Sequence, residues 1–216
     1  MDKRFAIFDM DGTLVDSMVF WQRLGREYLA SRGLTEGVEP VLERVKAMTM
    51  SESAALFVEE LGVPGTPEAV EAEMNGIMEI HYRRDIPLKP GAAAYLDGLR
   101  RRGARLCVAS ATAEPLMAAC LERLEVADRF EFLLSCETVG AGKSRPDVYL
   151  ACARRFGAEP GEIAVFEDAV YAARTAKDAG FYTAAVYDPA GAKSWEKLTA
   201  LADEAVLDWA DAAQTL

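Results

Sequence analysis

Two aspartates, Asp9 and Asp11, follow the apolar run at residues 5–8. A continuous apolar run of this kind is typical of a strand buried on both faces of a parallel sheet. Burying carboxylates at the end of such a strand costs free energy unless a cation lies next to them. A turn at Gly12 can bring the side chains of Asp9 and Asp11 towards one centre. The pair suits an aspartate nucleophile acting on phosphorus beside an acid/base carboxyl, with Mg2+ between them. Taken alone, the same aspartates could merely cap the following helix.

Polar residues also end two later apolar runs. Ser110 follows the run at residues 105–109, and Glu167 and Asp168 follow the run at 163–166. In open parallel sheets, ligands bind outside the carboxyl ends of the strands, so these side chains are expected at one edge together with the first pair. Two carboxylates at each of two strand ends exceed the negative charge that a site tolerates without a metal ion.

Lys143 stands shortly before a predicted helix at residues 146–156. Its ammonium group could neutralise both the Asp9 carboxylate and a phosphoryl group in transfer, with a smaller contribution from the helix N-terminus. A solvated loop lysine is the alternative when the residue is considered alone. The three polar strand ends favour the functional interpretation.

Two segments of different pattern predict the domain organisation. Residues 15–85 show only helical spacing and read as an inserted helical cap of about seventy residues, within the size range of a small domain. From residue 86 onwards apolar runs and helical segments alternate with short connections, which predicts a parallel sheet with right-handed crossovers. We therefore expect an α/β fold, a doubly wound (Rossmann-like) parallel sheet formed by residues 1–14 and 86–216.

Composition excludes several classes of partner. The 216 residues carry a net charge of −11, which argues against nucleic acid or an anionic membrane as a partner. No apolar run has the length of a membrane span, and the first residues lead directly into a strand, so we expect neither a membrane segment nor a signal peptide. The four cysteines form no C-x-x-C pair, which indicates reduced core cysteines and a cytoplasmic location. Nothing requires an oligomer, and we expect a monomer.

The motifs resemble those of a known superfamily. The inserted helices resemble the helical cap of the β-phosphoglucomutase-like branch of the haloacid dehalogenase-like hydrolases, and the resemblance covers essentially the whole chain. The motifs of this superfamily are matched in order by Asp9-x-Asp11-Gly12-Thr13, Ser110-x-Thr112, Lys143 and Glu167-Asp168.

The resemblance implies a role for each motif residue. Asp9 would be the nucleophile, and Asp11 would protonate the leaving alcohol and then activate water. Asp9, Asp168 and the backbone carbonyl of Asp11 would hold Mg2+. Glu167 would be a further or water-mediated ligand, and Lys143 would stabilise charge during transfer.

The substrate's phosphate would be bound by the second motif. Ser110 and neighbouring backbone N–H groups, including that of Ala111, would contact phosphate oxygens, and Thr13 would order the first loop beside them. Three positions depart from the family pattern: Ser144 replaces a common proline, and Ala169 and Ala172 replace a common serine and glycine. The alanine at position 169 lacks the hydroxyl of the common serine, so the metal has one polar group fewer near it. Polar groups around a metal site tune its affinity for the metal.

Residues of the inserted helices bear on specificity. Lys46 would contact the substrate when the cap closes, although an exposed helical lysine is an equally good interpretation. We expect Trp21 in the core, whereas Met48 and Met50 fit either a core or a specificity pocket.

Asp11 distinguishes between the reactions of the superfamily. Dehalogenases and phosphonate-cleaving relatives lack this aspartate, which can protonate a leaving alkoxide, so the resemblance implies chemistry on a phosphate ester. A sugar phosphomutase is the alternative, but Met50 replaces the arginine that grips its second phosphate and Trp21 replaces a histidine. A non-catalytic binding module is disfavoured because the motif residues are present. We expect a Mg2+-dependent phosphatase of a small phosphorylated metabolite, such as a sugar phosphate.

Overall fold

The computed structural model describes residues 3–45 and 48–216. These residues divide into two compact units. The sheet unit comprises the chain up to Ser17 together with Ile86–Leu216, and the helical unit comprises Met18–Asp85. In the part of the chain that the structure describes, no helix is both long and apolar enough to cross a membrane.

Among the described residues, six parallel strands form one sheet in the order β3-β2-β1-β4-β5-β6. The central strand is β1, and every one of its residues is buried. The strands are β1 (Phe5–Phe8), β2 (Arg105–Ser110), β3 (Phe132–Ser135), β4 (Ile163–Glu167), β5 (Tyr182–Val186) and β6 (Glu204–Val206). The predicted doubly wound α/β fold is therefore confirmed.

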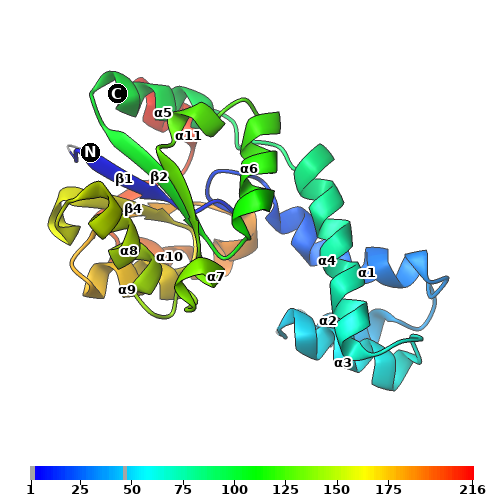
Figure 1. Ribbon diagram of the computed structural model, residues 1–216. Helices are drawn as coiled ribbons and strands as arrows, with labels where there is room; N and C mark the ends of the chain where they lie inside the picture. The colour runs from blue at the N-terminus through cyan, green and yellow to red at the C-terminus, as the bar shows by residue number, and fades with distance from the viewer. Residues whose placement is uncertain (1–2, 46–47) are drawn as a thin grey trace. The chain divides into compact units, whose positions relative to one another are not determined.

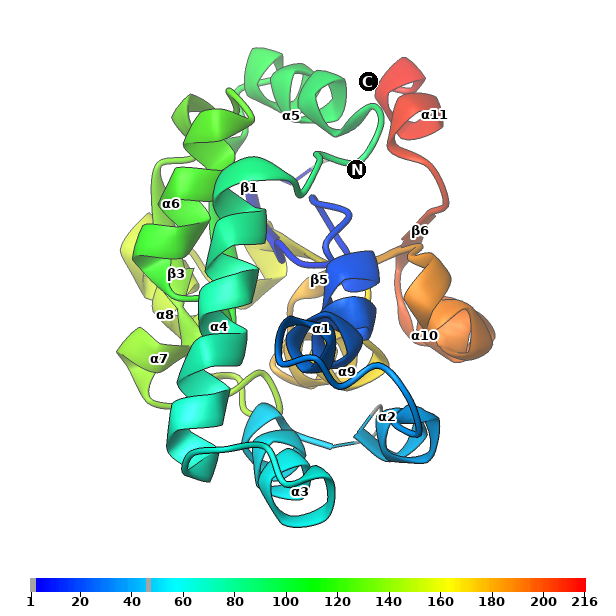
Figure 2. The same ribbon diagram turned by 90° about the vertical axis from the view of Figure 1, so that its right-hand side faces the viewer.

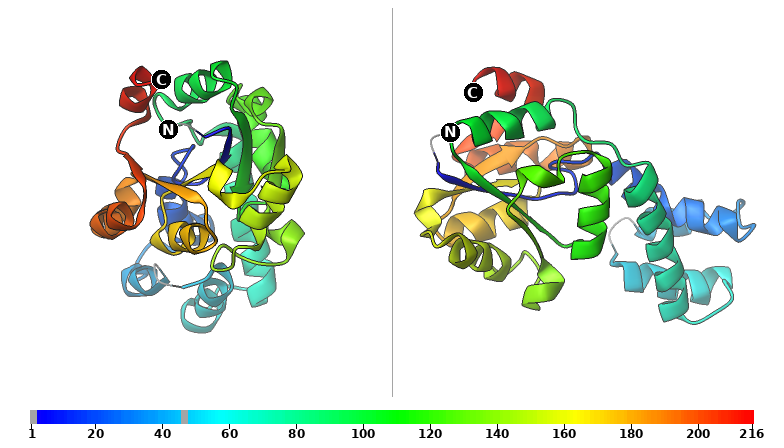
Figure 3. Two further views of the ribbon diagram at one scale, coloured as in Figure 1. Left: turned by 90° about the vertical axis from the view of Figure 1, so that its left-hand side faces the viewer. Right: turned by 45° about the horizontal axis from the view of Figure 1, so that its top comes forward.

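Helices cover both sides of this sheet (Figures 1 and 3). α5 and α11 lie beside each other on one side (Figure 2), whereas α8 packs on β1, β2 and β3, and α9 on β4 and β5, on the other. The helices of the sheet unit are α5 (Ala92–Arg101), α6 (Glu114–Arg123), α7 (Cys136–Val139), α8 (Asp147–Phe156), α9 (Val170–Asp178), α10 (Trp195–Leu201) and α11 (Trp209–Gln214), with 3-10 turns at Ala127–Arg129, Pro160–Glu162 and Pro189–Ser194.

The side chains of β1 alternate between two apolar cores. Phe8 stacks on Phe166 with ring centroids 4.4 Å apart, and Trp209 of α11 lies 6.0 Å from Phe8 on the same side. Ile7 points to the opposite side and joins a cluster that includes Tyr149 of α8. The sheet is thus fixed on both faces, which holds the ends of its strands in register.

The strand order reverses at β1, the central strand. Phe8 is aligned with Val108 of β2 on one side and with Phe166 of β4 on the other. The chain then stays attached to β4, because the backbone N–H of Asp9 donates to the carbonyl of Phe166 at 3.0 Å. Gly12 next adopts a φ of 76°, in the left-handed region that favours glycine, and turns the chain back.

The helical unit contains α1 (Met18–Ser31), α2 (Glu39–Val45), α3 (Met50–Leu61) and α4 (Pro67–Arg84). α4 packs against α1 and α3 (Figure 2). Thr49 and Glu52 form a capping box at the start of α3, in which each side chain accepts a hydrogen bond from the other residue's backbone N–H. This interaction satisfies two backbone N–H groups at the start of α3.

Candidate active site

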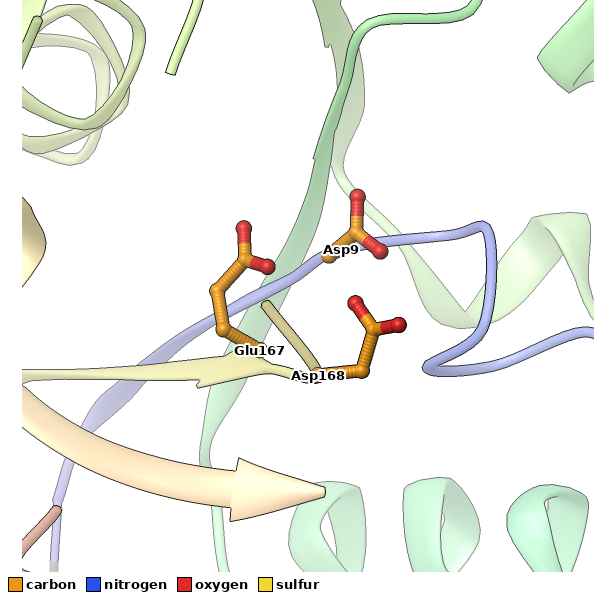
Figure 4. Close-up of side chains that lie close together, drawn as sticks. All are labelled: Asp9, Glu167 and Asp168. Carbon is orange, nitrogen blue, oxygen red and sulfur yellow. The ribbon is translucent and has the colours of Figure 1, made fainter. Parts of the chain in front are cut away.

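Three acidic side chains converge at the carboxyl ends of β1 and β4. Asp9 follows β1, Glu167 is the last residue of β4, and Asp168 follows it. Each offers a carboxylate oxygen within 4.8 Å of the others, and Figure 4 shows the three side chains close together. Asp9 and Glu167 are buried, whereas Asp168 is half-buried. The cluster lies where the strand order reverses, the position at which open parallel sheets bind ligands.

Lys143 is the cation that meets this cluster. It lies in the loop before α8, is 6% exposed, and donates from Nζ to Oδ1 of Asp9. The same Nζ donates to Oε1 of Glu167 at 2.7 Å. The lysine is buried and doubly paired, so the alternative of a solvated loop residue is wrong.

The pKa values of the cluster reflect burial and crowded negative charge. Burial raises the pKa of Asp9 well above its ordinary value, and Glu167 and Asp168 raise it further against the opposing charge of Lys143. Burial and the charge of Glu167 raise the pKa of Asp168 to about 7. Burial lowers the pKa of Lys143, but the two carboxylates it binds outweigh burial and raise it. Lys143 therefore remains protonated, while Asp9 and Asp168 resist ionisation.

The cluster has the composition of a divalent metal site. When all three carboxylates are ionised, they and the one ammonium group leave an excess of two negative charges, the charge that a divalent cation neutralises. Every donor is a carboxylate oxygen, the type of ligand that Mg2+ prefers. Asp9, Glu167 and Asp168 therefore fit Mg2+ in number, charge and chemistry.

The carboxylate of Asp11 is held by the second motif. The hydroxyl of Thr112 donates to Oδ2 of Asp11 at 2.7 Å, and Oγ of Ser110 lies 3.4 Å from the same oxygen. The backbone N–H of Thr112 in turn donates to Oγ of Ser110 at 3.1 Å. The ends of β1 and β2 are thus joined through side chains, and Thr112 is a residue whose contact with Asp11 was not foreseen.

The remaining predicted phosphate-site residues lie in the same unit. Thr13 is fully buried in the loop after β1, and its backbone carbonyl accepts a 2.9 Å hydrogen bond from Nε1 of Trp209. Its hydroxyl has no hydrogen-bond partner among the described residues. Ala111 is exposed directly after β2.

Sequence reasoning missed residues that touch or surround the acidic cluster. The hydroxyl of Tyr149 donates to Oε1 of Glu167 at 2.7 Å. Asp188 follows β5 and forms a 2.8 Å ion pair with Lys89, and the charges of both act on the pKa of Asp168. Asp188 could have been found because it ends a strand as the predicted residues do. Lys89 and Tyr149 carried no such signal.

The helical unit contains a cavity of about 780 Å³. Trp21, Met48 and Met50 are among its lining residues, so the methionines that fitted either a core or a pocket lie at a cavity. Trp21, expected in the core, is only half-buried there, and its Nε1 donates to the hydroxyl of Tyr82 at 3.2 Å. Lys46 lies outside the described residues.

A family model that matches most of the chain identifies the family of this protein. A model of the haloacid dehalogenase-like hydrolase family matches residues 4–180, a span that contains all four motifs. The chain belongs to this family. The resemblance deduced from the motifs is confirmed, and the hydrolase is an enzyme whose sheet unit carries the acidic cluster and Lys143.

Known proteins similar to this hydrolase include named phosphatases. Hexitol phosphatase B of Escherichia coli (strain K12) is 28% identical over 167 residues, which cover 76% of this chain and 75% of that protein. The phosphorylated carbohydrates phosphatase of Thermotoga maritima is 25% identical over 175 residues, covering 81% of each. Among solved structures, CbbY from Rhodobacter sphaeroides in complex with phosphate has a TM-score of 0.74 at 22% identity and covers 99% of this chain and 100% of that one. At that identity, the likeness shows a shared fold alone.

Proposed function

We propose that this hydrolase is a Mg2+-dependent phosphatase of a small phosphorylated metabolite, such as a sugar phosphate. The observation that carries the proposal is the buried Asp9 carboxylate, paired with Lys143 inside a cluster that fits a divalent cation. Its relatives include phosphatases named for hexitols and for phosphorylated carbohydrates, which supports a substrate of this class.

The proposed reaction proceeds in two displacements at phosphorus. An oxygen of Asp9 attacks the phosphoryl group, the bond to the ester oxygen breaks, and Asp11 donates a proton to the leaving alcohol. Asp11 then takes a proton from water, which attacks the aspartyl-phosphate and releases inorganic phosphate together with the free Asp9 carboxylate. Lys143 neutralises negative charge beside Asp9 in both displacements.

Mg2+ would be held by Asp9, Asp168 and the backbone carbonyl of Asp11, with Glu167 as a direct or water-mediated ligand. When bound, the ion neutralises charge on the phosphoryl oxygens and on Asp9.

The substrate's phosphate oxygens would be bound by Ser110 and the backbone N–H of Ala111, with Thr13 ordering the adjacent loop. We infer that the helical unit acts as a cap that sets specificity, and a substrate contact by Lys46 remains a prediction. A monomer in the cytoplasm is the expected form. The free, buried state of all four cysteines supports that compartment.

A sugar phosphomutase is the alternative. Met50 stands where that branch carries the arginine that binds the second phosphate, and Trp21 stands where it carries a histidine; both residues line the cavity of the helical unit. These replacements favour hydrolysis over transfer between two positions of one sugar.

Phosphate release from a panel of phosphorylated metabolites tests the proposal. We expect release by the wild type with Mg2+, loss of release without the metal, and no release by Asp9→Asn. Asp211→Asn, which alters an exposed aspartate on α11, is the matched control and should retain activity. Conversion of a sugar phosphate in the presence of a bisphosphate activator, with little free phosphate, would support the mutase and contradict the phosphatase.

A further inference from the structure

Tyr149 is a polar residue inside an apolar core. It lies in α8, is fully buried, and belongs to a cluster of aliphatic, aromatic and cysteine side chains packed on the sheet. Its ring centroid lies 6.1 Å from that of Phe181. A phenol hydroxyl in such surroundings is costly unless it finds a hydrogen-bond partner. That partner identifies what the residue does beyond filling space.

The partner is Glu167 of the acidic cluster. The hydroxyl of Tyr149 donates to Oε1 of Glu167 at 2.7 Å, and Nζ of Lys143 donates to the same oxygen at 2.7 Å. Within the described part of the chain both donors meet at Oε1, so Oε2 is the oxygen left to face a cation. All three side chains are buried, and the arrangement is shielded from water.

We propose that Tyr149 is a positioning residue of the metal site. Its hydroxyl fixes the carboxylate plane of Glu167, so that one oxygen holds Lys143 and the other faces the space shared with Asp9 and Asp168. This inference rests on the proposed function, because it requires Glu167 to bind Mg2+ directly or through water. Tyr149 itself touches neither the metal nor the substrate and acts through Glu167.

Loss of the hydroxyl has a defined consequence. The terminal torsion of a glutamate has a broad energy profile, so a carboxylate held by Lys143 alone samples more orientations. Some of these turn Oε2 away from the metal position. The apparent affinity for Mg2+ then falls, while the ring that fills the core remains in place.

Tyr149→Phe removes the hydroxyl and keeps the ring. Tyr95→Phe is the matched control, since Tyr95 is also buried and its hydroxyl has no hydrogen-bond partner among the described residues. The full-length proteins are titrated with Mg2+ alone by calorimetry, and thermal unfolding is followed with and without Mg2+. Tyr149→Phe should bind Mg2+ about 10- to 100-fold more weakly than wild type, the usual cost of losing a partner that orients a metal ligand. Tyr95→Phe should bind Mg2+ as the wild type does.

Kinetics separate positioning from a general loosening of the core. The Mg2+ concentration for half-maximal activity should rise in Tyr149→Phe, whereas kcat at saturating Mg2+ should stay close to that of the wild type. A lower kcat with an unchanged Mg2+ requirement would overturn the inference, as would equal calorimetric affinities in Tyr149→Phe and wild type. A wild type that binds no Mg2+ would overturn the proposed metal-dependent function, and this inference with it.

Discussion

The hydroxyl of Thr112 donates a 2.7 Å hydrogen bond to Oδ2 of Asp11 and thereby ties the loop after β2 to the loop after β1. Asp11 is the residue proposed to move protons in both displacements, and its carboxylate must point at the ester oxygen. Small errors in such an orientation are expensive, because a misplacement of about 1 Å can cost roughly 100-fold in rate.

Thr112→Val retains the shape of the side chain and removes this hydrogen bond. We expect kcat for phosphate release to fall by about tenfold, as the Asp11 carboxylate loses its fixed direction. Thr112→Ser keeps the hydroxyl and serves as the control. Equal activity of the two variants would show that the hydrogen bond does not position Asp11.

Lys143→Met leaves the carboxylates of Asp9 and Glu167 buried without their cation. Removing one partner of a buried ion pair typically costs about 3–5 kcal/mol, and we expect a loss of this size in the free energy of unfolding without Mg2+. Lys177→Met is the control, because its 2.6 Å pair with Asp203 is partly exposed and should contribute less than about 1 kcal/mol. Urea unfolding measures both, and equal losses would contradict this account of the buried pair.

Gly91 and Gly103 have nearly the same left-handed backbone, with φ of 83° and 84°. A Cβ at Gly91 would overlap the backbone nitrogen of Ala210, whereas a Cβ at Gly103 would meet no atom of the described residues within 4 Å beyond its own chain neighbours. Gly103→Ala should therefore cost only the backbone strain, about 1–2 kcal/mol.

Gly91→Ala should cost clearly more, because α11 must move, and with it the hydrogen bond from Trp209 to Thr13. Urea unfolding and phosphate release should both show the difference. Similar stabilities of the two variants would indicate that α11 is not held by this close approach.

His81 links two helices of the helical unit through ion pairs. Its ring nitrogens lie 2.9 Å from Glu27 and 2.7 Å from Asp85. Burial lowers the pKa of His81, but the hydrogen bonds and charges of both carboxylates outweigh burial and raise it above 6.5. Because the folded-state pKa is the higher one, the stabilisation is complete below pH 6.5 and is lost as the pH rises through the folded-state pKa.

The stability difference between wild type and His81→Phe should therefore shrink with rising pH. The pH-dependent part of this difference in the free energy of unfolding should stay below about 1 kcal/mol, because the side chains of Glu27 and Asp85 are nearly half exposed. Urea unfolding at a series of pH values measures this difference. A difference that does not change with pH would contradict the ion-pair account.

The fold was predictable because its signals are local. The apolar run Phe5–Phe8 has no polar alternation, as expected for a strand buried on both faces, and the later alternation of strands and helices required a parallel sheet. Short elements such as α7 (Cys136–Val139) escaped prediction, because one helical turn contains too few residues to show a period.

The candidate site was predictable where strand ends supply its residues. Asp9, Glu167 and Asp168 meet because parallel strands end at the same edge of the sheet. The contact of Tyr149 with Glu167 depends on the packing of α8 against the sheet, which spacing along the chain does not reveal. The half-buried position of Trp21 at a cavity likewise depends on how the helices pack.

The central claim is that Asp9 carries the phosphoryl group during turnover. Enzyme quenched in the presence of substrate and Mg2+ can be reduced with borohydride, which converts an aspartyl-phosphate to homoserine that mass spectrometry detects in the peptide containing residue 9. We predict this conversion in the wild type and none in Asp9→Asn, which lacks the carboxylate that attacks phosphorus. Turnover of substrate by the wild type without modification of Asp9 would contradict the account.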